Sequence, residues 1–148
     1  MEQRISLVTL GVRDLARSQA FYASLGWQGQ EVQDTVFFQA LGQAVVLWDR
    51  ARLAADSGVE DDGATFSGVV LAHNVRGRHE VDDVLVRAAG AGGTVTRAAA
   101  DTFYGGYAGC FRDPDGHVWE VAWNPGLPLD ERGGLTVPEW GVDAPEPG

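Results

Sequence analysis

The sequence predicts an α+β protein made of two tandem β-α-β-β-β modules. The pattern of apolar residues indicates a strand, a helix and three strands twice, and the two series begin roughly 60 residues apart. The chain has 148 residues, of which 45% are hydrophobic and 22% are charged. These values are typical of a single soluble domain with a substantial core.

The first module is expected over residues 1–57. A strand over residues 4–12 precedes a helix that begins after Asp14, a plausible N-cap, and ends before Gly26. Its apolar residues, Leu15, Phe21, Tyr22 and Leu25, fall on one helical face. Strands over 27–33, 35–40 and 43–48 and a short helix over 50–55 complete the module.

An acidic, Gly-containing connector over residues 58–65 separates this module from the second, expected over residues 66–125. The pattern predicts a strand over 66–75, a helix over 79–91 and strands over 94–98, 107–112 and 117–123. Residues 126–148 are rich in Gly and Pro, which predicts an extended tail anchored by Leu135, Val137 and Trp140.

The last two strands of the second module flank the segment Asp113-Pro114-Asp115-Gly116, whose residue types predict a tight turn. Alternation along the strand that follows puts Glu120 on the same face as Val118 and Ala122. A carboxylate in such an apolar row requires a cation, a metal or hydrogen-bond donors. Alternatively, it lies at a solvated rim beside an arginine, and the sequence leaves both interpretations open.

Composition excludes several classes of function. The net charge is −10 and the eleven basic residues, all Arg, are scattered, which argues against nucleic-acid binding. No apolar run approaches the roughly 18 residues of a membrane span, and the first ten residues lack a signal-peptide pattern, so we expect a cytoplasmic protein without membrane contact. Cys110 is the only cysteine, which excludes an internal disulfide and a thiolate-rich zinc site.

Two segments, TLGVRDLARSQAFYASLGW and GGYAGCFRDPDGHVWEVAWNP, resemble the vicinal oxygen chelate superfamily. This superfamily includes glyoxalase I, bleomycin-resistance proteins and extradiol dioxygenases. The resemblance extends to Pro125. It implies a curved mixed sheet that forms a cup, with helices on its outer face and a small molecule inside, and a homodimer whose second subunit often completes the cup.

The same resemblance bears on metal binding, because metal-dependent members carry a His or its equivalent on the first strand of each module and an acidic residue on the last. Glu120 matches one such position. The other positions hold Ser6 to Val8, Val45 to Trp48 and Gly68 to Val70. A single carboxylate is too few ligands for a divalent metal, so we expect no metal and no cofactor.

A cup lined by aromatic side chains and one carboxylate favours a planar or cationic ligand. The expected ligand-binding residues are Phe37, Trp48, His73, Phe103, Tyr104, Tyr107 and Glu120. Gly105-Gly106, beside two tyrosines, is the expected gate of the cup.

Three functions are compatible with these features. The first is a metal-independent protein that binds a small planar or cationic molecule. The second is a lyase, isomerase or dioxygenase-type enzyme in which Glu120 is a general base or part of a non-standard metal site. The third is a non-catalytic partner protein that docks through the acidic connector and the Pro-rich tail.

Overall fold

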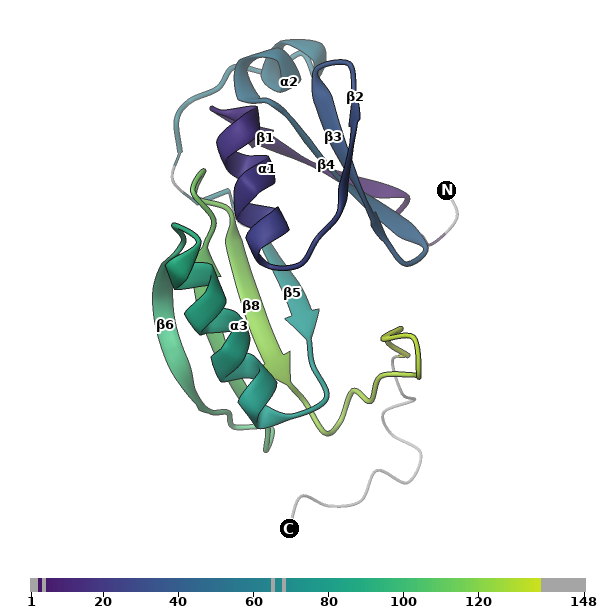
Figure 1. The fold of residues 1–148 in the computed structure, drawn as a ribbon, viewed down its shortest axis with the longest axis vertical. Helices are drawn as coiled ribbons and strands as arrows, with labels where there is room; N and C mark the ends of the chain where they lie inside the picture. The colour runs from purple at the N-terminus through teal and green to yellow at the C-terminus, as the bar shows by residue number, and fades with distance from the viewer. Residues whose placement is uncertain (1–2, 4, 65, 68, 137–148) are drawn as a thin grey trace.

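Each half of the chain forms its own four-stranded mixed sheet in the computed structural model, which describes residues 3, 5–64, 66–67 and 69–136 (Figure 1). The first module contains β1 (Leu7–Val12), α1 (Leu15–Ser24), β2 (Gly29–Val32), β3 (Thr35–Ala40), β4 (Gln43–Asp49) and α2 (Arg50–Asp56). The second contains β5 (Val70–Asn74), α3 (Arg78–Gly90), β6 (Thr94–Asp101), β7 (Tyr107–Arg112) and β8 (Val118–Trp123). The α+β class and the two tandem modules are therefore confirmed.

The two sheets have the same topology. Their strand orders are β1-β4-β3-β2 and β5-β8-β7-β6, with the first pair in each sheet parallel and the others antiparallel. No ladder joins one sheet to the other among the described residues. Within one chain the mixed sheet is thus divided in two, and β1 and β5 each lie at an edge.

Local signals in the sequence explain where the helices begin and end. The carboxylate of Asp14 accepts a hydrogen bond from the backbone N–H of Arg17 at 2.9 Å and so caps α1, as predicted. Gly26 follows α1 with a φ of 95°, a conformation that other residues rarely adopt. Asp49 caps α2 in the same way, through the backbone N–H of Arg52.

One apolar core is shared by the two modules. Tyr22 on α1 lies against Phe38 of the first sheet and Trp119 of the second, with ring centroids 5.6 Å and 6.2 Å away. Trp27, just beyond α1, also contacts both rings, at 5.3 Å and 5.7 Å. The face of each sheet that a helix covers therefore looks toward this common core, and the opposite face, here called the open face, looks away from it.

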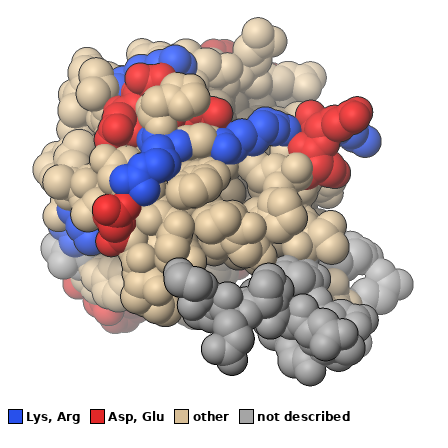
Figure 2. All heavy atoms as spheres, turned by 90° about the horizontal axis from the view of Figure 1, so that it is seen from below, with Lys and Arg blue, Asp and Glu red and all other residues tan. Residues whose placement is uncertain are grey.

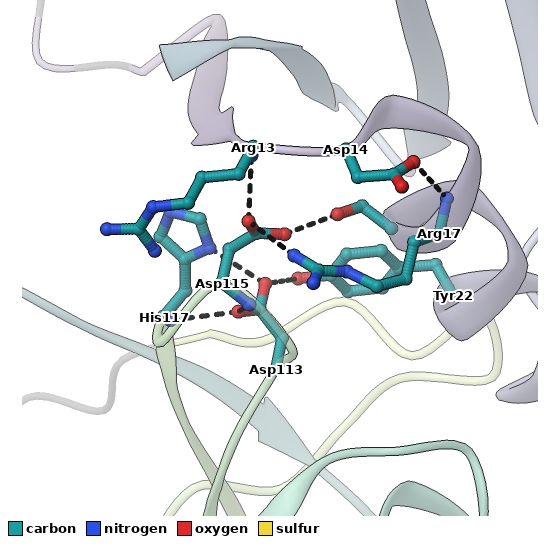
Figure 3. A network of polar contacts seen from close by, with 8 residues as sticks. Arg13, Asp14, Arg17, Tyr22, Asp113, Asp115 and His117 are labelled. Atoms are coloured by element: carbon teal, nitrogen blue, oxygen red, sulfur yellow. Dashed lines mark hydrogen bonds and ion pairs between the residues drawn. The ribbon is translucent and has the colours of Figure 1, made fainter. Parts of the chain in front are cut away.

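The Asp113–Gly116 turn is the polar link between the modules (Figure 3). Asp115 accepts hydrogen bonds from the backbone N–H of Arg13 at 2.8 Å and from the guanidinium of Arg17 at 3.0 Å, and the Ser18 hydroxyl donates to its other oxygen. Both carboxylates are buried, with 4% exposure for Asp113 and 8% for Asp115. Buried carboxylates are tolerated only when they are paired in this way.

Asp113 is bonded to one side chain from each module. The Tyr22 hydroxyl donates to its Oδ2 at 2.6 Å, and Nδ1 of His117 lies 2.8 Å from the same oxygen. We call Ser18, Tyr22, Asp113, Asp115 and His117 the inter-module clamp. Its members come from α1 and from the turn between β7 and β8, so it fixes how the two halves pack.

The pKa values in the clamp follow from burial and from these hydrogen bonds. Burial acts to raise the pKa of Asp113, but the hydrogen bond and charge of His117, with the Tyr22 hydroxyl, outweigh it and lower that pKa below its usual 3.8. Burial and the neighbouring Asp113 carboxylate raise the pKa of Tyr22 far above its usual 10.0. At neutral pH the clamp therefore contains the neutral phenol of Tyr22, which is hydrogen-bonded to the ionised carboxylate of Asp113.

The segment after β8 differs from the extended tail that its composition predicts. Leu129 and Leu135 form a β-bridge, and Oδ1 of Asp130 accepts hydrogen bonds from the backbone N–H groups of Arg132 and Gly134 at 2.8 Å and 2.7 Å. The reason is the Asp side chain, which closes the loop on itself. The expected anchors Val137 and Trp140 lie outside the described residues.

Candidate functional site

Glu120 lies on the open face of the second sheet, where it is paired with an arginine. Nη2 of Arg97 on β6 is 3.0 Å from Oε2 of Glu120, and the two side chains are 48% and 35% exposed. The carboxylate is thus neither deeply buried nor alone among apolar neighbours. Of the two interpretations that the sequence left open, the rim carboxylate beside an arginine is the one that the structure shows.

Cys110 on β7 completes a small polar cluster with this pair. It lies opposite Glu120 in the β7–β8 ladder and opposite Arg97 in the β6–β7 ladder. The same Nη2 of Arg97 is 3.2 Å from its Sγ. The hydrogen bond to Cys110, ahead of the charge of Glu120, raises the pKa of Arg97, so this cation stays charged.

Phe37 and Trp48 lie on the open face of the first sheet. Phe37 on β3 is opposite Val46 and Thr35 is opposite Trp48, which places these side chains on one face. Phe37 is 37% exposed, and the indole N–H of Trp48 donates to Asp34 at 3.2 Å. Because the two open faces look away from the shared core, one chain does not bring Phe37 and Trp48 next to Glu120.

Two of the expected ligand contacts belong to the loop between β6 and β7. Phe103 is fully exposed, and its ring packs edge-on against Tyr104 at 5.3 Å between centroids. A side chain at Gly106 would meet the backbone carbonyl of Trp123 at 2.4 Å, and Gly105 has a φ of 78°. Both glycines are therefore required by the loop geometry that presents this aromatic pair to solvent.

Tyr107 contacts helix α3 and not the open face. Its hydroxyl donates to Asp82 on α3 at 3.0 Å, and the guanidinium carbon of Arg78 lies 4.3 Å from its ring centroid. The side chain lies on the helix-covered face of the second sheet, so its expected role in lining a cup on the open face does not fit. Alternation along β7 was known from the sequence, but the face that α3 covers was not.

His73 also differs from its expected place. It is paired with Val121 in the β5–β8 ladder, whereas Ala72 is paired with Glu120, so His73 and Glu120 point to opposite faces. Loss of solvent around the ring lowers the pKa of His73, against a smaller opposing effect of Glu80. His73 lines a groove between the modules and not the open face.

The metal centre implied by the family resemblance does not fit these residues. Among the described residues, no group of three or more His, Cys, Asp or Glu side chains is arranged so that it could hold a metal ion. Near Glu120 the open face offers Ala72 from β5 and Cys110 from β7, and the matching strands of the first module offer Leu7 and Val46. The guanidinium of Arg97 already pairs with the carboxylate of Glu120, and its positive charge disfavours the binding of a metal cation at that position.

The clamp residues Ser18, Tyr22, Asp113, Asp115 and His117 were not identified as functional from the sequence. The residue types indicate the turn, but they assign its two aspartates only the role of shaping it. The one signal available was the pair of aspartates itself, since a turn of this type needs a single Asp at its first position. Their hydrogen bonds give the clamp a structural role, because they join residues that are 91 and 97 positions apart in the sequence.

These features define a class: an α+β protein of paired β-α-β-β-β modules, each presenting one open sheet face, with a carboxylate–guanidinium pair on the second. The chain belongs to the Glyoxalase/Bleomycin resistance protein/Dioxygenase superfamily, whose family profile matches residues 4–121.

Solved structures agree with this assignment. A glyoxalase-related enzyme from Fulvimarina pelagi is 36% identical, with a TM-score of 0.84 over 90% of this chain and 97% of that one. A hypothetical protein from S. aureus is 27% identical, with a TM-score of 0.74 over 83% and 94% of the two chains. A lactoylglutathione lyase from Agrobacterium tumefaciens is 24% identical over 82% and 93%, with a TM-score of 0.62, and shares the fold.

No curated protein matches the sequence. In the part of the chain that the structure describes, none of the helices has the length and apolar character needed to cross a membrane.

Proposed function

We propose that this protein binds a small planar molecule on the open face that carries Glu120, without a divalent metal. The observation that carries the proposal is the 3.0 Å contact between Glu120 and Arg97, at the one position where the chain matches a metal ligand of its family. Arg97 supplies there the positive charge that a metal ion supplies in metal-dependent members. The pair is half exposed and therefore accessible to a ligand.

The pair also narrows the ligand class. Arg97 offers N–H donors and Glu120 offers acceptor oxygens a few ångströms away, so together they match a group that both accepts and donates, such as a cyclic amide. A simple cation is less well matched, because the charge of Glu120 is already balanced by Arg97. The aromatic side chains of the Phe103 loop would stack on the flat face of such a molecule.

A homodimer is the second part of the proposal. Apolar side chains are exposed at the edge strands β1 and β5 and in the residues just before them: Ile5 (63%), Leu7 (46%), Val69 (57%) and Val70 (47%). Exposed apolar edges of this kind are typical of subunit interfaces. Pairing β1 of one copy with β5 of another would place Phe37 and Trp48 of one subunit across from Glu120 of its partner, which would close a cup.

The charge distribution supports a small-molecule partner over nucleic acid. Figure 2 shows arginines beside acidic side chains in one band, with uncharged side chains filling the area beneath it. A continuous basic surface, which a phosphate backbone requires, does not form on this face.

The proposal is tested by titrating the protein with three flat bicyclic compounds: 4-quinolone, quinoline and N-methylquinolinium. 4-Quinolone, which carries both a donor and an acceptor, should bind at least tenfold more tightly than the other two, and Glu120→Gln and Arg97→Gln should each remove this preference. Equal affinity for all three compounds would reject the ligand class. A stoichiometric divalent metal in the purified protein, held with micromolar affinity, would reject the metal-free part.

An enzymatic function is the second candidate, and the 36% identical relative described as a glyoxalase-related enzyme favours it. Only Oε2 of Glu120 contacts Arg97, so Oε1 has no hydrogen bond to any described residue, and the Glu120 side chain is 35% exposed. That oxygen could accept a proton from a bound substrate. An assay that follows lactoylglutathione decides the question, because Glu120→Gln should abolish turnover without loss of folding, and unchanged activity would reject the enzymatic role.

A further inference from the structure

A groove between the two modules is distinct from the site around Glu120 and Arg97. It has a volume of about 890 Å³, and its walls come from the helix-covered face of the first sheet, from β5 and from the 129–135 loop. Phe38, Val45, Leu71, Trp27 and Trp119 are among its apolar lining residues. Glu120, Arg97, Phe37 and Trp48 do not line it, so it is a separate site from the one proposed above.

The groove has a small apolar extension. A void of about 50 Å³ is lined by Tyr22, Leu25, Val84 and Phe111 and shares Trp27, His73 and Trp119 with the groove. The rings of Trp27 and Trp119 stand at 90° to each other with centroids 5.7 Å apart. The two indoles are therefore in edge-to-face contact with each other, and together they form an aromatic wall against which a further ring can pack.

The charges at the rim of the groove are mainly positive. Arg76, Glu80 and Arg132 are its charged lining residues, in a protein whose net charge is −10. Arg76 donates to the backbone carbonyls of Asp130 and Glu131, at 2.8 Å and 3.2 Å, and so holds the loop against the groove. The Arg132 guanidinium makes no hydrogen bond or ion pair with any described residue.

His73 adds a neutral polar group to this rim. It lies in the groove next to Glu80, and its pKa is lowered by loss of solvent around the ring. At neutral pH the imidazole is therefore uncharged and can donate or accept a hydrogen bond. The groove as a whole combines aromatic side chains, neutral hydrogen-bonding groups such as His73 and Asn74, and the Arg132 guanidinium, which pairs with no described residue.

We infer that this groove is a second ligand site, which takes a hydrophobic organic anion: an aromatic carboxylate with its ring packed against Trp27 and Trp119 and its carboxylate on Arg132. The aromatic lining matches the ring, and the Arg132 guanidinium, which pairs with no residue in the described part of the chain, matches the carboxylate. Because the walls come from both modules, a bound ligand also stabilises the packing of one module on the other.

The test compares 2-naphthoate with its neutral counterpart 2-naphthamide by calorimetry. In the unmodified protein, naphthoate should bind about tenfold more tightly than naphthamide. Arg132→Gln should remove that difference and leave naphthamide unchanged, whereas Arg87→Gln on the exposed surface of α3 should preserve it. In a ¹H–¹⁵N spectrum the indole signals of Trp27 and Trp119 should shift and that of Trp48 should not.

Ala40 on the wall of the groove provides a second variant, since Ala40→Trp should fill the space and abolish binding of both compounds. Loss of binding in Glu120→Gln would place the compounds on the open face and overturn the inference, and so would an unchanged naphthoate preference in Arg132→Gln. Because the quinolone titration depends on Glu120 and the naphthoate titration does not, either site can fail without the other.

Discussion

The phenolic oxygen of Tyr22 lies 2.6 Å from Oδ2 of Asp113, although the two residues are 91 positions apart. The same oxygen accepts a hydrogen bond from the Trp119 indole at 3.2 Å. One hydroxyl of the first module is thereby bound to two side chains of the second. The relative placement of the two open faces depends on this contact as well as on the apolar core.

Tyr22→Phe should destabilise the protein by about 1–3 kcal/mol, because it leaves the buried Asp113 carboxylate without one of its donors. The free energy of unfolding in urea measures the loss. Tyr107→Phe is the matched control, since its hydroxyl meets the exposed Asp82 and its removal should cost little. Equal losses in the two variants would mean that the clamp contributes no special stability.

The stability should fall at both ends of the pH range. The folded-state pKa of Asp113 lies below its ordinary value of 3.8, so its contribution is present above that value and is lost as the pH falls through the lower, folded pKa. The pKa of Tyr22 is raised above 10.0, so its contribution is present below pH 10.0 and is lost as the pH rises beyond it.

Melting temperatures from pH 2 to pH 11 check this profile. Asp113→Asn should be less stable at neutral pH and should lose part of the decline in acid, and Tyr22→Phe should lose part of the decline in alkali. If both variants keep the full slopes of the unmodified protein, other groups are responsible for the pH dependence.

Gly106→Ala should destabilise the loop between β6 and β7 by more than about 1 kcal/mol, since the added Cβ would stand 2.4 Å from the backbone carbonyl of Trp123. Gly42→Ala is a suitable comparison, because nothing lies within 4 Å of its Cβ position. Thermal unfolding of the two variants would show the difference. A tolerated alanine at position 106 would mean that the loop is not fixed by this close approach.

Val70→Lys should convert the proposed dimer to a monomer, because it places a charge on the exposed edge strand β5. Val86→Lys on α3 is the control: that residue is 72% exposed, compared with 47% for Val70, and lies on a helix and not on β1 or β5. Light scattering coupled to size-exclusion chromatography reports the mass of each variant. An unchanged mass for Val70→Lys would exclude β5 from the interface.

The order of elements could be predicted from the sequence because turn residues and caps are local signals. Asp14 and Gly26 mark the ends of α1 in the sequence and in the structure. Alternation along β8 also correctly predicts that the side chain of Glu120 lies on the other face of the sheet from Trp119 and Val121. These inferences need only the residues within one element.

The partner of Glu120 could not be predicted in the same way. Arg97 reaches it from β6, whose ladder with β7 has register shifts on both sides of Arg97. A shift by one residue turns every side chain to the other face, so the position of Arg97 depends on pairing that the sequence does not display. Asp115 was missed for a related reason, since its burial comes from α1, almost a hundred residues earlier.

The clamp has a final consequence for the peptide connection between the halves. All of its contacts, like those of Tyr22 and Trp27 with Trp119, are non-covalent and lie outside residues 58–64 of the connector. Cutting the backbone in that connector would therefore leave two fragments that remain bound to each other. The protein behaves in this respect as a heterodimer whose two chains happen to be joined end to end.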